Sequence, residues 1–261
     1  MEPHIVVPLR KEYENNHLLL MELSIVIPVF NKDKNIVALL NDIALSLQPD
    51  VHYEIIVVDD GSTDRTADVL RSCLQLNPRL RVIRHWTHQG QSAALITGVK
   101  LAKSPWIVTL DGDSQNDPKD IERLLTERNR NGVLAHNRLI TGLHHIREDS
   151  IIRRLSSRIA NLIRASLLRD PCPDSACGIN LFPRNIFLAL PRFDHMHRFL
   201  PALFNSYGCQ VSPVIVNHRP RSNGNSKYNI FNHLWVGVVD ILGVMWLQRR
   251  ACNATGDEIK K

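Results

Sequence analysis

The stretch from Trp106 to Pro118, with the sequence WIVTLDGDSQNDP, constrains the fold more than any other part of the chain. Its opening residues are mostly apolar or β-branched, which suits a short buried strand, and they are too few for a helix. Asp111 is therefore expected at the carboxyl end of this strand, with Asp113 just beyond it. Because open parallel α/β sheets bind ligands beyond the carboxyl ends of their strands, both acids should face a ligand.

Asp111 and Asp113 are predicted to hold a divalent metal ion. Gly112 between them lets the backbone turn tightly and lets a ligand come close to the two carboxylates. At about 4 Å and an effective dielectric constant of about 20 they repel each other by about 4 kcal/mol, a cost that a cation removes. Hard oxygen ligands suit Mg²⁺ or Mn²⁺, and Mg²⁺ is usually bound by one or two carboxylates plus substrate phosphates. Gln115 adds a carbonyl oxygen or orients a metal-bound water.

The competing interpretation of this stretch is an acidic turn that caps the next helix. It suits Asp117, because an aspartate N-cap followed by Pro118 at the first helical position is a common helix start. For Asp111 and Asp113 the metal is favoured, since a second strand upstream also ends in acids.

Upstream of this stretch, strand-like segments alternate with segments of helical periodicity. Strands are expected at 23–29, 54–60 and 81–85, and helices at 33–47, from the turn at 61–64 to residue 76, and at 91–103. Strands that alternate with helices of about a dozen residues imply right-handed βαβ units and a parallel sheet. The predicted fold class is therefore α/β, with Asp59 and Asp60 reaching the same sheet edge as Asp111.

The loop after the first strand, residues 28–31 (PVFN), contains no glycine. This argues against a dinucleotide-binding fold, which needs Gly-x-Gly-x-x-Gly there, and against a Walker A loop. It also argues against a sugar-nucleotide pyrophosphorylase, which should have a glycine-rich loop at this point. A nucleotide can still bind if Asp59 or Asp60 contacts its base and its diphosphate reaches the metal. Asp60 is also explained as a turn residue before Gly61.

The composition bounds the size of the core and the kind of partner. At 261 residues, 44% of them hydrophobic, the chain can bury a full core. Its formal charge of +6 suits an anionic partner, and charge alone leaves nucleic acid, a nucleotide-sugar and an anionic membrane surface open. Five scattered cysteines lack the paired spacing of a zinc site, and no secretory signal is visible, so a reducing cytoplasm is expected. Residues 1–22 are expected to form a flexible extension.

Three segments resemble family 2 glycosyltransferases of the GT-A fold in their order and spacing: SIVIPVFN at 24–31, VVDDGSTD at 57–64 and LDGDSQNDP at 110–118. Within that family the sequence is most similar to the dolichyl- and polyprenyl-phosphate glycosyltransferases, the dolichol-phosphate mannose synthase type. The resemblance covers about residues 23–250. It implies a Rossmann-like, mostly parallel central sheet flanked by helices, a catalytic domain at 23–232, Mg²⁺ or Mn²⁺ as cofactor and no nucleic-acid partner.

The resemblance also implies a site for the nucleotide-sugar donor. The residues of this site are Pro28, Phe30, Asn31, Asp59, Asp60, Asp111 and Gln115. Asp59 or Asp60 would contact the nucleoside. The metal and the diphosphate would be surrounded by Asp111, Asp113 and Gln115. Ser114 stands where the family usually has leucine, and the segment 88–90 (HQG) lacks the asparagine that often precedes the glycine, but neither departure removes a ligand.

Further matches to the family lie in the second half of the chain. Arg138 follows a segment at 133–137 that is expected to be a strand, and the family places an arginine there that faces the phosphates. Asp174 begins a segment, 174–182, that resembles the family's Asp-x-x-x-Gly-x-x-x-Phe, in which the aspartate lies near the transferred sugar. The segment 195–200 (HMHRFL) is expected to help shape the sugar site, although surface histidines are the more common explanation.

The segment 221–228 (RSNGNSKY) matches the family's Arg-x-x-Gly-x-Ser-Lys-Tyr. Arg221 and Lys227 offer positive charge on a loop that could close, neutralise a leaving diphosphate and exclude water. Ser226, together with Arg138, is assigned to the acceptor phosphate. An ordinary solvent-exposed loop is the alternative.

The predicted reaction is attack by a polyprenyl phosphate, undecaprenyl or dolichyl, on the anomeric carbon of a UDP- or GDP-linked sugar. A phosphate monoester is largely dianionic at neutral pH, so the acceptor is already a nucleophile and needs no strong base. Asp113, Arg221 and Lys227 then serve catalysis by stabilising the leaving diphosphate. Asp174 positions the sugar.

Two other functions compete with this reaction. If the acceptor were a sugar hydroxyl of a glycan or glycolipid, its deprotonation would be required and Asp174 would become the base. A noncatalytic nucleotide- or membrane-binding module is the rival from another class of protein. Such a module would not need Asp113 or Arg221.

Residues 233–247 are apolar apart from Asp240, with tryptophans near both ends and two arginines beyond. This segment is shorter than the roughly 20 apolar residues that span a bilayer, so an amphipathic helix in the membrane interface is expected over 233–250. A core helix is the alternative, and residues 251–261 are expected to form a disordered tail. The chain is thus predicted to be peripheral on the cytoplasmic face of a membrane surface, alone or with a membrane partner subunit.

Overall fold

The computed structural model describes residues 22–49, 51–130, 137–144, 165–168, 170, 172, 177–217, 219 and 230–250. The strands are β1 (Leu23–Val29), β2 (Tyr53–Asp59), β3 (Leu80–Arg84), β4 (Trp106–Thr109), β5 (Arg138–His144), β6 (Asn180–Pro183) and β7 (Gln210–Val216). The helices are α1 (Ile36–Ser46), α2 (Thr66–Leu76), α3 (Gln91–Leu101), α4 (Asp120–Asn129), α6 (Arg184–Ala189), the 3₁₀ helix η3 (Met196–Phe199), α7 (Leu200–Ser206) and α8 (Ile230–Arg249).

The strands form one mixed sheet in the order β3-β2-β1-β4-β6-β5-β7. β1 pairs in parallel with β2 on one side and with β4 on the other, and β3 extends the parallel half. β6 runs antiparallel to β4 and to β5, whereas β5 and β7 are parallel. The predicted α/β fold, with a mostly parallel central sheet flanked by helices, is confirmed.

The chain changes its direction of progress across the sheet at β1. From β1 it moves outward through β2 to β3, and it then returns to the other side of β1 to form β4. At such a switch point the loops from two neighbouring carboxyl ends separate and leave a crevice. The residues that follow β1 and β4, beginning at Phe30 and Leu110, therefore flank the place where a ligand is expected.

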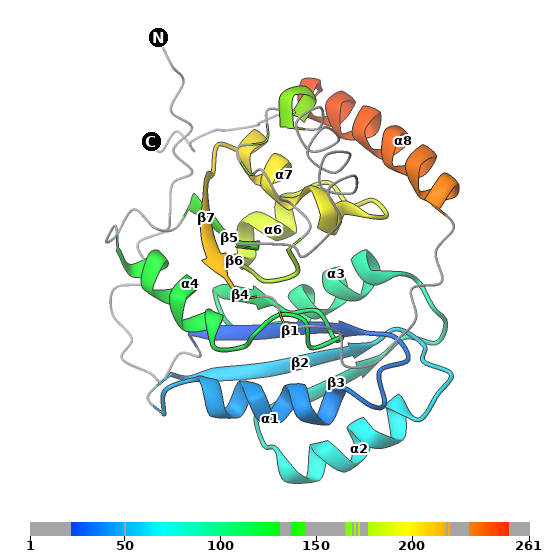
Figure 1. Cartoon of the computed structure of the whole chain (residues 1–261), viewed down its shortest axis with the longest axis vertical. Helices are drawn as coiled ribbons and strands as arrows, with labels where there is room; N and C mark the ends of the chain where they lie inside the picture. Colours follow the sequence, from blue (N-terminus) through cyan, green and yellow to red (C-terminus); the bar gives the residue numbers. More distant parts are fainter. Residues whose placement is uncertain are drawn as a thin grey trace, which may run out of the picture.

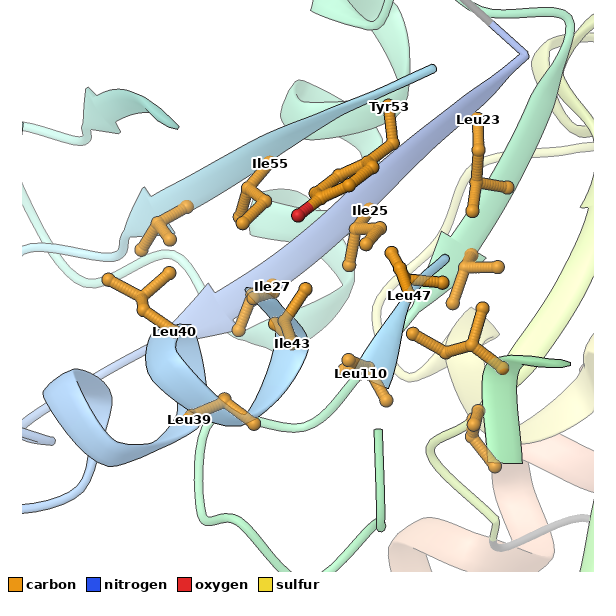
Figure 2. Close-up of a cluster of buried hydrophobic side chains, with 14 of the residues drawn as sticks. Leu23, Ile25, Ile27, Leu39, Leu40, Ile43, Leu47, Tyr53, Ile55 and Leu110 are labelled. Carbon is orange, nitrogen blue, oxygen red and sulfur yellow. The ribbon is translucent and has the colours of Figure 1, made fainter. Parts of the chain in front are cut away.

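One face of the sheet is covered by α1, α2 and α4 (Figure 1). α1 packs through apolar residues at helical spacing, because such residues share one side of the helix. Figure 2 shows these side chains lying against the apolar residues of β1 and β2, and labels Leu39, Leu40, Ile43, Ile25, Ile27 and Ile55. Full burial of one such side chain contributes about 1.5 to 3 kcal/mol, which anchors the loops at the sheet edge.

The other face is covered by α3, α6, η3 and α7, with α8 on the outside beyond α7 (Figure 1). α3 approaches β1 closely because Gly98 has no side chain, and an added Cβ there would lie 2.4 Å from Val26 Cγ1. Val244 of α8 is buried in the same apolar cluster. The apolar cluster on this face therefore extends from the central strand β1 to the last helix, α8.

The predicted bounds of the early elements are close to those observed. The strand at 23–29 coincides with β1, and those at 54–60 and 81–85 are each displaced by a single residue. α8 begins earlier than predicted, at Ile230. Residues 1–21 and 251–261, predicted to be a flexible extension and a tail, lie outside the described residues.

Two predictions of local structure were wrong. α4 begins at Asp120, so Asp117 and Pro118 lie in a turn before the helix and not at its N-cap and first helical position. In that turn the Asp117 carbonyl accepts the Asp120 N–H at 3.0 Å and Asp117 Oδ1 accepts the Lys119 N–H at 3.1 Å. Arg138 begins β5 and does not follow a strand ending at Asn137. Of the segment expected to be that strand, residues 133–136 lie outside the described residues.

Candidate active site

Asp111 lies at the switch point, just beyond the end of β4, and its carboxylate is held from several sides. Its Oδ1 accepts a hydrogen bond from Gln91 Nε2 at 2.8 Å, and the Asn116 side chain also hydrogen-bonds to it. The backbone of Gly178 packs so close that an added Cβ would lie 1.9 Å from Asp111 Oδ2. These contacts fix the carboxylate, and only glycine fits at position 178.

The charge of Asp111 is disfavoured in this position. Burial, and then the neighbouring charge of Asp113, raise the pKa of Asp111 to about 6, against opposing contributions from Gln91, Asn116 and Lys32. The two carboxylates therefore lie close enough to repel each other. A cation bound between them would remove that repulsion and lower the pKa again.

The available ligands suit a hard divalent cation that shares its coordination shell with a substrate. Within the described ranges, no group of three or more histidine, cysteine, aspartate or glutamate side chains could hold a metal on its own. Two carboxylates with an amide oxygen are a suitable ligand set for Mg²⁺, because phosphates and water usually fill its other coordination positions. Asp113 Oδ1 accepts the Gln115 N–H at 3.2 Å, so these two predicted ligands belong to one tight turn.

The turn that carries the paired acids is tightly packed and strained. At Gly112 an added Cβ would lie 2.6 Å from Val29 Cγ1, so glycine lets the turn reach the end of β1. Ser114, where the family usually has leucine, has a φ of 61° in the left-handed region. Its buried hydroxyl has no hydrogen-bond partner in the part of the chain that the structure describes. Such strain, of about 1 to 3 kcal/mol, is typical of turns that bind ligands.

A cavity of about 390 Å³ opens beside Asp111, a volume within the range of small-molecule sites. It is lined by the carboxyl ends of β1 and β4, the first turns of α3, the segment 177–180, residues 197–200 and the middle of α8. Pro28 and Asp111 are the predicted donor residues found in this lining. Asp111 therefore stands between the crevice at β1 and this cavity.

Phe30 and Asn31, which follow β1, lie against the loops after β2 and β3. Asn31 has a φ of 54°, and its Oδ1 accepts the Thr63 N–H at 2.9 Å. The Phe30 ring stacks on the His88 ring with 4.0 Å between centroids. The structure thus brings both predicted residues to the carboxyl edge, and it adds His88, which sequence reasoning missed.

Asp60 is buried and its carboxylate is fully engaged. His85 Nδ1 lies 2.7 Å from Oδ1 and His88 Nδ1 lies 2.8 Å from Oδ2. The backbone N–H groups of Gln89 and Gly90 donate to the two oxygens at 3.0 and 2.7 Å. Asp60 therefore organises the loop between β3 and α3, which favours a structural role over a contact with the nucleoside.

Asp59 is also buried. Its Oδ1 accepts the Ser62 N–H at 3.0 Å. Its Oδ2 lies 3.3 Å from Arg84 Nε, a charge contact that lacks hydrogen-bond geometry. Asp59 thus keeps one incompletely bonded oxygen, and a nucleoside contact through it stays a prediction.

Arg138 lies away from the paired acids. It stands at the start of β5, whose direction matches that of β4 because β6 reverses between them, so it belongs to the opposite edge of the sheet. Its side chain is 3% exposed, donates to Gln210 Oε1 at 2.8 Å and lies 3.4 Å from Glu127 Oε1. The structure does not bring Arg138 to the place where an acceptor phosphate was expected.

Four predicted site residues, Asp174, Arg221, Ser226 and Lys227, lie outside the described residues. Arg219, which is near Arg221 in the sequence, is bonded to the turn that carries the paired acids. The Arg219 N–H donates to the Gln115 carbonyl at 2.8 Å. The Arg219 guanidinium bridges Asp42 and Asp117, with Nη2 2.8 Å from Asp117 Oδ1. Arg219, which precedes Arg221 by two positions in the sequence, was missed because its partners are remote in the chain.

Fold and site together define a glycosyltransferase of the GT-A fold. The chain belongs to glycosyl transferase family 2, which it matches over residues 24–190. It is 31% identical over 240 residues to a dodecaprenyl-phosphate galacturonate synthase of Rhizobium johnstonii, covering 90% of this chain and 70% of that protein. It is 31% identical over 209 residues to an undecaprenyl-phosphate 4-deoxy-4-formamido-L-arabinose transferase of Pseudomonas fluorescens, covering 79% of this chain and 60% of that protein. The predicted family and enzyme class are confirmed.

Solved structures show the same fold. A glucosyl-3-phosphoglycerate synthase from Mycobacterium tuberculosis, crystallised with Mn²⁺, uridine diphosphate and phosphoglyceric acid, has a TM-score of 0.65 and 16% identity, covering 90% of this chain and 80% of that one. Its structure with Mg²⁺ and uridine diphosphate has a TM-score of 0.65, covering 87% of this chain and 79% of that one. At this identity the likeness establishes the GT-A fold alone.

Proposed function

We propose that this protein transfers a sugar from a UDP- or GDP-linked donor to a polyprenyl phosphate such as undecaprenyl phosphate, for the modification of envelope glycans or lipids. The observation that carries the proposal is the position of the cavity. Asp111 borders it on one side, and α8, which exposes an apolar face, borders it on another. The two relatives named above carry a polyprenyl phosphate in their names, which supports this class of acceptor.

The leaving diphosphate would be held at the paired acids. Asp111, Asp113 and Gln115 are proposed to bind Mg²⁺ or Mn²⁺ there together with the donor. When bound, the cation supplies positive charge that stabilises the departing diphosphate. Arg221 and Lys227 follow Arg219, which is tied to this turn, and are proposed to donate to the same leaving group.

The acceptor phosphate is proposed to enter the cavity. Arg198 lines this cavity with an exposed side chain and offers the countercharge that Arg138 cannot supply from the opposite edge. A phosphate oxygen forms the new bond to the anomeric carbon while the bond from that carbon to the diphosphate breaks, with inversion at the carbon. The dianionic phosphate needs no strong base. Asp174 would position the sugar, and Ser226 would assist at the phosphate.

Attachment to a membrane surface is proposed to run through α8. Within the described ranges, no helix combines the length and apolar character that crossing a bilayer requires. α8 instead exposes an apolar stripe of residues that share one side of the helix: Val238, Val239, Leu242 and Trp246 are 45, 50, 58 and 62% exposed. Such a face suits a helix lying in the membrane interface, with Arg249 and Arg250 near lipid phosphates. We place the protein peripherally on the cytoplasmic face, alone or with a membrane partner subunit.

The alternative, transfer to a sugar hydroxyl with Asp174 as base, is the less supported function. Neither of the two sequence relatives described above is named for a transfer of that kind. The cavity beside Asp111 also contains a cation, Arg198, which an anionic acceptor would use and a neutral hydroxyl would not.

The experiment that tests the proposal is a transfer assay with purified protein. Undecaprenyl phosphate is incubated with a panel of UDP- and GDP-sugars, with and without Mn²⁺ or Mg²⁺, and the lipid fraction is analysed for a charged glycolipid. We expect product with at least one donor and only with metal. No product with any donor, together with no metal-dependent binding of nucleotide, would overturn the proposal. Product with a glycan in place of the lipid phosphate would favour the alternative.

A further inference from the structure

The cavity that Asp111 borders has another polar group in its lining, which the proposed reaction does not yet use. His197 of η3 lines the cavity, and its Nδ1 lies 2.8 Å from the hydroxyl of Ser92 in the first turn of α3. The His197 backbone N–H also donates to that hydroxyl, at 3.4 Å. Ser92 is 1% exposed, so this pair is built into the protein and is not a surface contact.

The Ser92 contacts fix the orientation of the His197 ring and favour one tautomer. The hydroxyl oxygen accepts the backbone N–H, and when its own hydrogen is directed at Nδ1 the ring proton is on Nε2. No hydrogen bond joins Nε2 to any other residue that the structure describes, and Nε2 is not sealed from solvent. Burial, followed by the charge of Arg198, lowers the pKa of His197 to about 4, so the ring is neutral at physiological pH. His197 therefore brings to the cavity lining a neutral ring whose Nε2 is bonded to no residue in the described part of the chain.

The first turn of α3 links this donor to the paired acids. Gln91 donates to the Asp111 carboxylate, and the next residue, Ser92, bonds to His197. Neighbouring residues on a helix point in different directions, so a single helix start can position both groups independently. The sugar of a nucleotide-sugar is joined to the diphosphate, which the proposed function places at Asp111. It would extend from there into the cavity.

We propose that His197 Nε2–H donates a hydrogen bond to a hydroxyl or ring oxygen of the donor sugar, and that Ser92 is the positioning residue that holds the ring for this contact. The inference rests on the proposed function in one respect, that the donor is a nucleotide-sugar bound at Asp111. In this inference His197 of η3 and Ser92 of α3 together recognise the donor sugar.

The test compares the binding of a nucleotide with and without its sugar. UDP-glucose, UDP-galacturonic acid and GDP-mannose are screened by calorimetry in Mn²⁺, and the probe that binds is set against UDP or GDP alone. His197→Ala should weaken the nucleotide-sugar by about 3- to 10-fold, the range of one neutral hydrogen bond. It should leave the affinity for UDP or GDP unchanged. His197→Gln, which keeps a side-chain donor, should restore part of the loss.

The matched control is His52→Ala, which removes an exposed histidine just before β2, at the opposite edge of the sheet, and should change neither affinity. Equal losses for nucleotide-sugar and free nucleotide, or no loss for either, would overturn the inference. If wild-type protein binds nucleotide-sugar but makes no glycolipid, the proposed acceptor fails while the test of His197 still stands. If it binds no nucleotide at all, both fail.

The role of Ser92 is tested by a double-mutant cycle. Ser92→Ala should lower the affinity for the nucleotide-sugar but not for UDP or GDP, and Ser92→Ala combined with His197→Ala should lose no more than His197→Ala alone. Ser72→Ala, at an exposed serine of α2, is the control for removal of a helical hydroxyl. Additive losses in the cycle would show a merely structural role for Ser92 and would overturn this part of the inference.

Discussion

The two halves of the sheet differ in whether strand direction alone brings the functional side chains to one edge. In the parallel half, β3-β2-β1-β4, all strands end at one edge, so Asn31, Asp60 and Asp111 meet there. In the other half β6 reverses direction, and Arg138 at the start of β5 falls on the opposite edge. At the edge where Asp111 lies, η3 and α8 instead complete the lining of the cavity. In the proposed function, the parallel half would therefore hold the diphosphate end of the donor, and the mixed half would shape the space beyond it.

The largest expected effect is in the parallel half. Asp113→Asn should lower the rate of glycolipid formation by about 100- to 1000-fold, the usual cost of removing one group that stabilises developing charge. Thermal unfolding should be nearly unchanged, because the substitution keeps the shape of the side chain. Asp68→Asn, at an exposed acid paired with Arg71 on α2, is the control and should keep full activity. If Asp113→Asn keeps its activity, Asp113 is not needed for catalysis and the catalytic role of this sheet edge is contradicted.

Gly178→Ala tests the contact between the two halves. The added methyl group would fall 1.9 Å from Asp111 Oδ2, so the carboxylate or the 177–180 segment must move. We expect activity to fall by about 10- to 100-fold, and the Mn²⁺ concentration needed for half-maximal rate to rise, because misplacing a metal ligand weakens the site.

Gly243→Ala on α8, where an added Cβ meets nothing within 4 Å, is the matched control. It should behave as wild type. Wild-type metal dependence in Gly178→Ala would mean that the position of the Asp111 carboxylate does not matter for metal binding.

Arg198→Ala tests the assignment of the mixed half to the acceptor. The loss of a charged hydrogen bond should raise the KM for undecaprenyl phosphate by about 10-fold or more, with the affinity for UDP or GDP unchanged. Steady-state kinetics with the lipid varied at saturating donor measure this. Arg71→Ala, at an exposed arginine of α2, serves as the control. An increase confined to the KM for the donor would show that Arg198 contacts the sugar or the diphosphate of the donor and not the acceptor phosphate.

The pKa of Asp111 gives a prediction about stability without metal. Because the folded-state pKa of Asp111, about 6, lies above its ordinary value of 3.8, the folded state holds a proton that the unfolded state releases as pH rises between these values. Asp111→Asn should therefore raise the free energy of unfolding by about 1 to 3 kcal/mol above pH 6, and the gain should vanish below about pH 4. Denaturant titrations at several pH values with EDTA measure this. A gain that is independent of pH would contradict the electrostatic explanation.

The smallest effect is expected on α8. Leu242→Ser replaces a side chain that is 58% exposed, so the fold should be retained while binding to anionic lipid vesicles weakens by about 3- to 10-fold. Co-sedimentation with vesicles of phosphatidylglycerol and phosphatidylethanolamine measures it. Leu45→Ser, at an 84% exposed leucine of α1 on the other face of the sheet, is the control. Equal losses in both variants would show that α8 is not the attachment surface.

The parallel half could be predicted from the sequence because its rules are local. Continuous apolar runs marked the strands, and parallel connections sent every strand end to one edge, which placed Asp111 before any contact was known. The same rules could not show that Asp60 is enclosed by His85, His88 and two backbone N–H groups. That enclosure depends on how the loop after β3 folds over it.

The mixed half could be predicted less well, because its functional contacts join segments far apart in the chain. The reversal at β6 has no local signal in the sequence, so Arg138 was expected at the wrong edge. Arg219 contacts Asp42 and Asp117, and His197 contacts Ser92, across separations that no motif spans. The segment 195–200 was expected to shape the sugar site, but only packing reveals which of its histidines borders the cavity.

On α8, Ile241 lines the cavity while Leu242, the next residue, points outward. The thickness of a single helix with its side chains, about 10 Å, therefore separates the chemistry from the proposed lipid surface. A polyprenol would need to bring only its headgroup and first isoprene units inside, while the remainder of its tail stays in the bilayer. Turnover should then depend little on how many isoprene units the acceptor contains.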